Sequence, residues 1–125
     1  MSLPSINPTQ TKAWKSLESH FKQIELQKMQ HLFSEDSSRA DRFKIEWQDF
    51  YFDYSKNRIN DETVSLLLKL AEEVKLKEAI QKQFAGGKIN ETEDRAVLHT
   101  ALRDFDIMKP EVKATLQKMQ LFSEE

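Results

Sequence analysis

The hydrophobic pattern changes period over residues 42–54, and this change constrains the fold more than any other feature of the sequence. On each side of a short connection, large apolar residues occupy every second position: Phe43, Ile45 and Trp47, then Phe50, Phe52 and Tyr54. Alternation with period two, rich in aromatic residues, is typical of β-strands. The sequence therefore predicts a β-hairpin over about residues 42–55. Since a lone hairpin is marginal in water, we expect it to pack against other elements.

The other apolar residues lie three and four positions apart, the spacing that places them on one face of an α-helix. Asn7 and Pro8 suit the start of the first such stretch, and Asn60 suits the start of the next. The adjacent Gly86 and Gly87 suit a helix stop. We expect helices at about residues 8–33, 61–84, 92–105 and 110–122. The expected fold class is mainly α with one β-hairpin (α+β), and 125 residues suffice for one domain or part of a larger one.

The composition excludes several classes of function. With no Cys, the chain has no disulfide framework, no thiolate zinc site and no Cys nucleophile. Its only two Gly are adjacent, so neither a dinucleotide-binding nor a Walker phosphate loop can be formed. The net charge of −2 lacks the basic excess typical of nucleic-acid binding, and no apolar run reaches the ~18 residues of a membrane span. We expect a cytoplasmic protein with neither nucleic acid nor membrane as partner.

The histidines give little support for a metal site, because His20, His31 and His99 are scattered and form no pair at helical spacing. We predict no metal site.

One polar arrangement is a candidate site. Asn90 and Glu93 have the spacing of a capping box, which predicts that a helix begins there. On that helix Arg95, His99 and Arg103 lie four residues apart and share one side, as an anion-binding or interface strip would. The alternative is an exposed basic edge neutralised by nearby carboxylates, those of Glu91, Asp94 or Asp106.

Four stretches of the sequence resemble the glucose-6-phosphate isomerase (phosphoglucose isomerase) family. These are INPTQTKAWKSL at residues 6–17, DYSKN at 53–57, GGKINETEDRAVLHTALR at 86–103 and DIMKPEVKATLQKM at 106–119. The resemblance covers nearly the whole chain, is of the bacterial type and concerns the N-terminal region of the family. Relatives usually have a longer segment where this chain has only residues 104–109.

The resemblance implies an aldose–ketose isomerase that interconverts glucose 6-phosphate and fructose 6-phosphate in glycolysis and gluconeogenesis. Such enzymes transfer a proton between C1 and C2 through a cis-enediol, without an organic cofactor, at sites built on a homodimer interface. A Glu serves as base, His and Lys assist ring opening, and an Arg stabilises the intermediate. The implied fold has two αβα sugar-isomerase (SIS) domains preceded by a mostly helical region, and this chain resembles only that region.

The family's catalytic residues and its Ser/Thr phosphate loop all match positions beyond Glu125, so the resemblance assigns no catalytic or substrate-binding residue here. The resemblance places Arg95, His99 and Arg103 in an N-terminal motif of the family but gives them no chemical role, which favours a packing or interface role. We therefore expect an N-terminal fragment of the isomerase that is inactive alone, with the SIS domains absent. The alternative is a stand-alone, non-catalytic helical interaction module.

Overall fold

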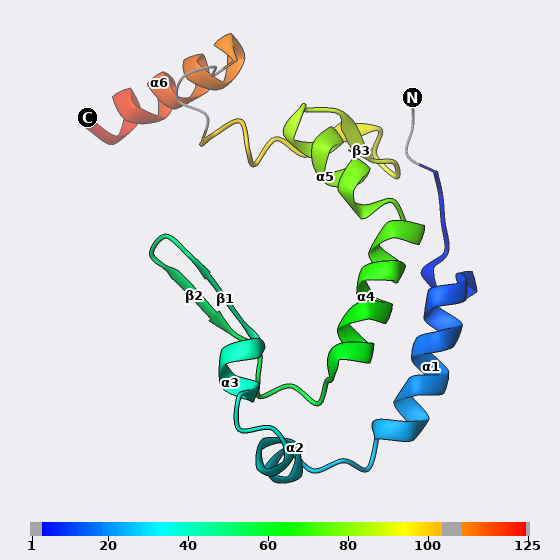
Figure 1. Ribbon diagram of the computed structural model, residues 1–125. Coiled ribbons are helices and arrows are strands. Elements are labelled where there is room, and N and C mark those ends of the chain that lie inside the picture. The colour runs from blue at the N-terminus through cyan, green and yellow to red at the C-terminus, as the bar shows by residue number, and fades with distance from the viewer. Residues whose placement is uncertain (1–3, 104–108, 125) are drawn as a thin grey trace. The chain divides into compact units, whose positions relative to one another are not determined.

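A computed structural model describes residues 4–103 and 109–124, which divide into two compact units (Figure 1). The first unit is Ile6–Val74 and the second consists mainly of Lys75–Glu125. Helices dominate both units, and the described residues also form two small antiparallel hairpins. The predicted α+β class is therefore confirmed, although one hairpin was expected and two are found. Part of the short segment 104–109, and Asp106 with it, lies outside the described residues.

The first unit contains most of the regular structure. Its elements are η1 (Pro8–Gln10), α1 (Lys12–Ile24), α2 (Met29–Glu35), α3 (Arg39–Arg42), β1 (Lys44–Trp47), β2 (Phe50–Asp53) and α4 (Asp61–Glu73). All buried side chains among the described residues lie in this unit. The second unit contains α5 (Leu76–Phe84), β3 (Lys88–Asn90), β4 (Arg95–Ala96) and α6 (Pro110–Glu124).

Helices α1 and α4 lie side by side and antiparallel in the first unit (Figure 1). At the start of α1, the Glu73 carboxylate from the end of α4 accepts the backbone N–H of Ala13 at 3.2 Å. A carboxylate is favourable there because the helix dipole makes the N-terminal end positive. At the other end, Arg58 donates to the carbonyl oxygen of Glu25, the C-cap of α1, at 2.7 Å. Side chains distant in sequence thus satisfy both ends of α1.

A single hydroxyl joins the middle of α1 to the start of α4. His20 of α1 is 3% exposed, and its Nε2 lies 2.8 Å from Thr63 Oγ1. The same oxygen accepts the backbone N–H of Asn60 at 3.1 Å, while Asn60 Oδ1 accepts the N–H of Thr63 at 2.9 Å. These reciprocal bonds form the capping box that starts α4. Glu62 lies on the other side of the imidazole, with its carboxylate 3.4 Å from Nδ1.

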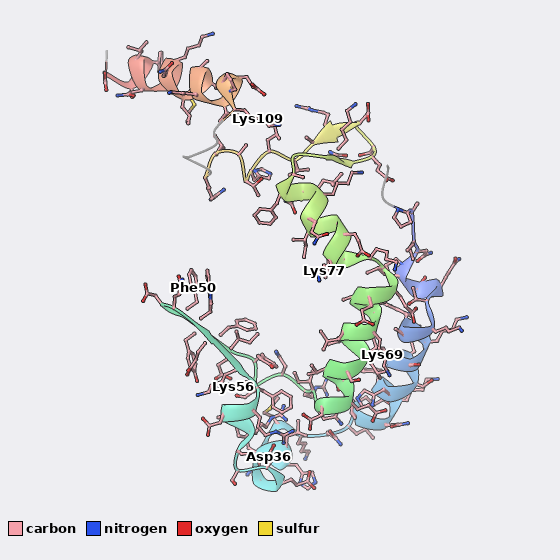
Figure 2. All side chains as sticks on the ribbon, turned by 45° about the horizontal axis from the view of Figure 1, so that its top comes forward. Asp36, Phe50, Lys56, Lys69, Lys77 and Lys109 are labelled. Carbon is pink, nitrogen blue, oxygen red and sulfur yellow. The ribbon has the colours of Figure 1, made fainter. Side chains whose placement is uncertain are left out.

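The predicted hairpin forms at β1 and β2, where Ile45 pairs with Phe52 and Trp47 pairs with Phe50. Phe50 lies at the far end of the hairpin and Lys56 at its base (Figure 2). Only the base is buried: the ring of Phe43 is 3% exposed and meets Tyr54 edge-on, with centroids 5.7 Å apart. The strands themselves carry exposed aromatic side chains, so the expectation that they pack against other elements is not met within this unit.

The predicted helix over residues 92–105 is not found in the described part of that range, 92–103, where turns and β4 occur instead. The proposed capping residues close a hairpin turn. Asn90 Oδ1 accepts the N–H of Glu93 at 3.3 Å, and Asp94, at φ 50°, turns the chain back so that β4 pairs with β3. Lys88 and Asp94 form an ion pair across this turn at 2.5 Å. A capping-box contact is local and serves a turn as well as a helix start.

The expected helix over residues 61–84 is divided into α4 and α5. The division falls at Lys75, whose φ of 59° is left-handed and cannot continue an α-helix. Gly86, at φ 70°, follows the end of α5, where a left-handed residue without a Cβ is favoured. The first expected helix, at residues 8–33, is likewise divided into η1, α1 and α2. Within the described residues, every helix is too short or too polar to cross a lipid bilayer.

We expect Thr63→Val to destabilise both α1 and α4, because it removes the hydroxyl that joins them. The imidazole of His20 and the backbone N–H of Asn60 would then lack a hydrogen-bond partner. The cost should be about 1–3 kcal/mol of local stability. Hydrogen–deuterium exchange followed by mass spectrometry should therefore show faster exchange in both helices. Thr115→Val is the control, because this exposed hydroxyl donates only to a carbonyl of its own helix. Unchanged exchange in α1 would show that the hydroxyl does not join the helices.

Candidate functional site

The three residues of the proposed strip, Arg95, His99 and Arg103, do not share a helix face. Arg95 lies in β4, exposed, with Nη1 3.8 Å from a Glu93 carboxylate oxygen. His99 and Arg103 lie in the turns that follow, where Arg103 donates to the backbone carbonyl of His99 at 3.0 Å. The geometric basis of the strip is therefore wrong, and its role as an interface stays a prediction.

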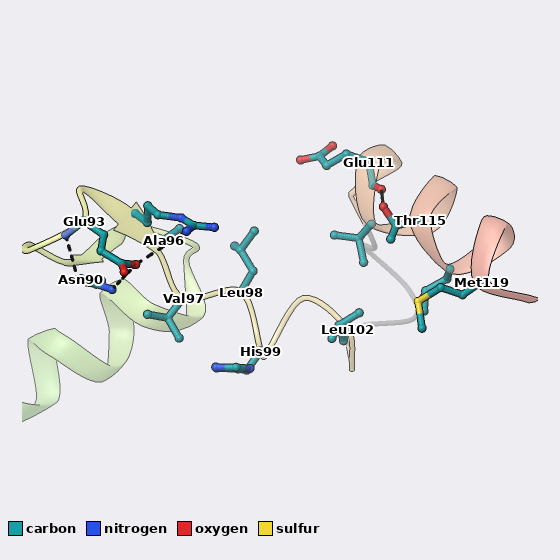
Figure 3. Close-up of a pocket in the computed structure, with 13 residues that line it drawn as sticks. Asn90, Glu93, Ala96, Val97, Leu98, His99, Leu102, Glu111, Thr115 and Met119 are labelled. Carbon is teal, nitrogen blue, oxygen red and sulfur yellow. Dashed lines mark hydrogen bonds and ion pairs between the residues drawn. The ribbon is translucent and has the colours of Figure 1, made fainter.

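Two surface hollows of the second unit instead have His99 in common. The larger, of about 630 Å³, is drawn in Figure 3. Its apolar wall is made by side chains of the turns after β4 and of α6: Val97, Leu98, Leu102, Val112, Leu116 and Met119. Polar side chains make up nearly half of the lining: Asn90, Glu93, Arg95, His99, Glu111 and Thr115. Arg95 lines this hollow, whereas Arg103 lines the other, of about 570 Å³.

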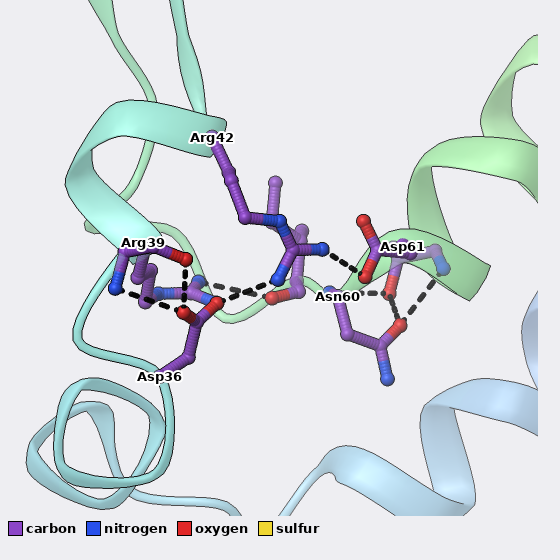
Figure 4. Close-up of polar contacts among 8 residues, drawn as sticks. Asp36, Arg39, Arg42, Asn60 and Asp61 are labelled. Atoms are coloured by element: carbon purple, nitrogen blue, oxygen red, sulfur yellow. Dashed lines mark hydrogen bonds and ion pairs between the residues drawn. The ribbon is translucent and has the colours of Figure 1, made fainter.

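A cluster of polar contacts lies in the first unit, around the buried side chain of Arg39 (Figure 4). Arg39 begins α3 and is 2% exposed. Its Nε donates to the carbonyl of Ser55 at 2.8 Å, and its Nη2 donates to those of Asn57 and Ile59 at 2.8 and 2.9 Å. One guanidinium thus holds three carbonyls of the loop that connects β2 to α4.

Two aromatic rings complete the surroundings of this cation. The guanidinium carbon of Arg39 lies 4.6 Å from the ring centre of Phe43 and 5.6 Å from that of Phe33. Cation–π contacts and carbonyl dipoles thus replace part of the hydration that Arg39 loses on burial. The role of Arg39 cannot be read from side-chain spacing, because its partners are backbone carbonyls.

A second arginine, Arg42, connects α3 to the end of α2 and to the start of α4. Its Nη1 lies 2.7 Å from a carboxylate oxygen of Asp36, and its Nη2 pairs with Asp61 at the start of α4. The hydrogen bond and charge of Asp61, with the charge of Asp36, raise the pKa of Arg42 above its ordinary value. The hydroxyl of Ser38, followed by its backbone N–H and by Arg42, lowers the pKa of Asp36.

The DYSKN segment has a structural role in this fold. The Asp53 carboxylate accepts from Lys56 Nζ at 2.6 Å and from the backbone N–H of Ser55 at 2.8 Å. The hydrogen bond from Lys56, together with that from the Ser55 backbone N–H, holds the pKa of Asp53 far below its usual range. This turn directs the chain from β2 into the loop that binds Arg39, and Ser55 within it is fully buried.

The three histidines lie apart from one another in the described fold. His20 is buried between α1 and α4, His31 is 3.1 Å from Glu35 within α2, and His99 borders the two hollows. Over residues 4–103 and 109–124, no group of three or more His, Asp or Glu side chains is arranged to hold a metal ion.

Replacing Arg39 with Lys should destabilise the Ile6–Val74 unit although the charge is kept, because one ammonium cannot replace a planar fork that reaches three carbonyls. We expect the free energy of unfolding to fall by about 3 kcal/mol, measured by urea titration. Arg95→Lys is the matched control on an exposed strand and should change stability by less than about 0.5 kcal/mol. An equal response of the two variants would refute the structural role of Arg39.

Acid should destabilise the first unit through Asp36 and Asp53. Their pKa values are lowered by folding from an ordinary value of 3.8, so their stabilisation is complete above that value and is lost as pH falls through the folded-state values. Between about pH 5 and pH 2, the urea midpoint should fall less steeply for Asp53→Asn than for the parent chain. Asp49→Asn, in the exposed hairpin connection, serves as the control. Parallel slopes for the parent chain and Asp53→Asn would contradict this assignment.

Comparisons with known proteins agree on one family. A profile described as phosphoglucose isomerase matches residues 53–125. The glucose-6-phosphate isomerase of Christiangramia forsetii is 51% identical over 130 aligned residues, which cover 97% of this chain and 24% of that protein. The protein of the same name from Gloeobacter violaceus is 47% identical over 125 residues, covering 93% of this chain and 23% of that protein. The chain thus spans about a quarter of the length of these relatives, and it belongs to the phosphoglucose isomerase family.

Proposed function

We propose that this chain is the N-terminal part of a glucose-6-phosphate isomerase, an aldose–ketose isomerase that interconverts glucose 6-phosphate and fructose 6-phosphate. The observation that carries the proposal is the 51% identity to a protein of that name over 97% of this chain. A second relative of the same name is 47% identical over 93% of this chain, and the family profile covers more than half of the residues.

Within such an enzyme, the 125 residues act as a scaffold. The buried or strongly paired polar groups of the first unit are each committed to structure: Arg39 to loop carbonyls, Asp53 to a turn and His20 to Thr63. In this proposal the reacting Glu, His, Lys and Arg and the phosphate-binding loop belong to the three quarters of the relatives outside the match. They carry out proton transfer between C1 and C2 without an organic cofactor.

The finer family properties belong to the same proposal. They are two SIS domains following this region, a homodimer whose interface forms the active sites, and a cytoplasmic role in glycolysis and gluconeogenesis. Arg95, His99 and Arg103 would then serve in packing against those domains. The apolar wall of the hollow beside Arg95 and His99 supports this assignment, since it offers a contact surface.

A second candidate is a stand-alone helical interaction module. The observation in its favour is that the Ile6–Val74 unit caps its own helices and has its own buried cluster. The two candidates differ in the isomerase activity they predict once the rest of the enzyme is supplied: the scaffold predicts activity, and the stand-alone module predicts none.

The discriminating measurement is a coupled isomerase assay. The 125-residue chain, purified from a host without its own isomerase, should show no conversion of glucose 6-phosphate. A chimera in which it replaces the matching quarter of the C. forsetii protein should recover activity to within about tenfold of the parent, a difference of about 1.4 kcal/mol in barrier height.

Two results would overturn the proposal. Turnover by the chain alone would show that it contains reacting groups. A chimera that folds, by circular dichroism and size-exclusion chromatography, but does not isomerise the sugar would favour the stand-alone module.

A further inference from the structure

The β1–β2 hairpin has one apolar face and one polar face. Paired residues of an antiparallel hairpin point to the same side, and the side alternates along each strand. The pairs Ile45–Phe52 and Trp47–Phe50 therefore share one face, which we call the aromatic face. The opposite face carries the pairs Lys44–Asp53 and Glu46–Tyr51. The hairpin thus has the alternation of a strand pair with one buried side.

The aromatic face is nevertheless open in this structure. Its four side chains, Ile45, Trp47, Phe50 and Phe52, are 56–68% exposed. Only neighbouring rings contact each other: Trp47 stacks on Phe50 at 5.7 Å between centroids, and Phe52 stacks on Tyr54 at 5.8 Å. In Figures 1 and 2, no other described element of the Ile6–Val74 unit covers the hairpin beyond its base.

On the polar face, by contrast, the charged side chains form ion pairs with one another and with neighbouring residues. Lys44 lies 3.1 Å from Glu46 and 3.4 Å from Asp41, and its ammonium lies 5.9 Å from the ring centre of Tyr51. Asp53 is paired with Lys56. This face is suited to water. Only the aromatic face therefore needs a partner, and the surface of that partner must be apolar.

The size of the aromatic face limits what can cover it. Large apolar side chains of this kind bury about 150–250 Å² each, so four that are about 60% exposed offer roughly 500 Å². Stable complexes between separate proteins bury about 800 Å² on each partner. The aromatic face is therefore too small to hold a second copy of the chain or another protein by itself. It is large enough for a segment of the same polypeptide, because docking within one chain does not cost the translational and rotational entropy of association.

The relatives contain such polypeptide. The C. forsetii protein aligns with 97% of this chain over only 24% of its own length, so about three quarters of it lies outside the match. We propose that in full-length members of the family the aromatic face of the hairpin docks on an apolar surface of these remaining three quarters of the same chain, while the polar face stays in water. The docking face lies at the end of the hairpin away from the Arg39 cluster, which holds its base.

Hydroxyl-radical footprinting with mass spectrometry tests this proposal residue by residue. The samples are the 125-residue chain alone and the C. forsetii chimera that contains it. Oxidation of Trp47, Phe50 and Phe52 should be about fivefold slower in the chimera, since docking buries side chains that are now exposed. Tyr51 is the matched control: it lies on the opposite face of the same hairpin, is 63% exposed, and should oxidise equally in both samples.

Several outcomes would overturn the proposal. One is equal oxidation of Trp47 and Phe50 in the two samples. Another is protection of both faces alike, and a third is protection in the isolated chain that grows with concentration, which would identify a second copy as the occupant. If the chimera does not fold, the C. forsetii protein itself is footprinted over the hairpin that aligns with residues 44–53, and one-sided protection is again required.

A second measurement uses stability. In the chimera, the paired change Trp47→Ser and Phe50→Ser should lower the unfolding temperature, whereas Tyr51→Ser should not. Neither readout depends on catalysis. A protected face in a chimera without isomerase activity would support docking and contradict the proposed function, and an active chimera with an exposed face would do the reverse.

Discussion

The first unit depends on the burial of one cation, the guanidinium of Arg39. A buried charge is costly unless hydrogen bonds and favourable contacts replace its hydration, and Arg39 donates to three backbone carbonyls and lies against two aromatic rings. Because the carbonyls belong to one loop, the same interaction fixes where β2 ends and where α4 begins. It also buries Phe43, which places the base of the hairpin on α3.

The position of α4 then determines the rest of this unit. Asn60 and Thr63 start the helix next to the last carbonyl held by Arg39, that of Ile59. Thr63 contacts His20, Glu73 at the other end of α4 caps α1, and Arg58 from the Arg39-bound loop reaches the C-terminal end of α1. Few apolar side chains are buried in this unit, so polar contacts at helix ends carry much of its organisation. This is consistent with a chain of which 32% of residues are charged.

The exposed surfaces have a different character from this interior. The aromatic face of the hairpin and the apolar wall of the hollow beside His99 are both surfaces that isolated soluble proteins tend to cover. The chain spans about a quarter of its relatives, and the proposed scaffold role, in which apolar faces meet further polypeptide, would account for both surfaces. The stand-alone module accounts for the capped helices of the first unit but gives no reason for an uncovered aromatic face.

The α+β class, the β1–β2 hairpin and the family could all be predicted from the order of the residues. The alternation around Trp47 and Phe50 is a local signal that needs no knowledge of distant residues, and the family match depends on the order of residues alone. The folded chain alone reveals the roles of Arg39 and Thr63, whose partners include backbone carbonyls for Arg39 and a side chain 43 residues away for Thr63. It also decided that Asn90 and Glu93 close a turn, and therefore that Arg95, His99 and Arg103 share no helix face. Periodicity indicates which faces of an element are apolar, whereas the role of a polar group depends on the donor or acceptor that folding brings next to it.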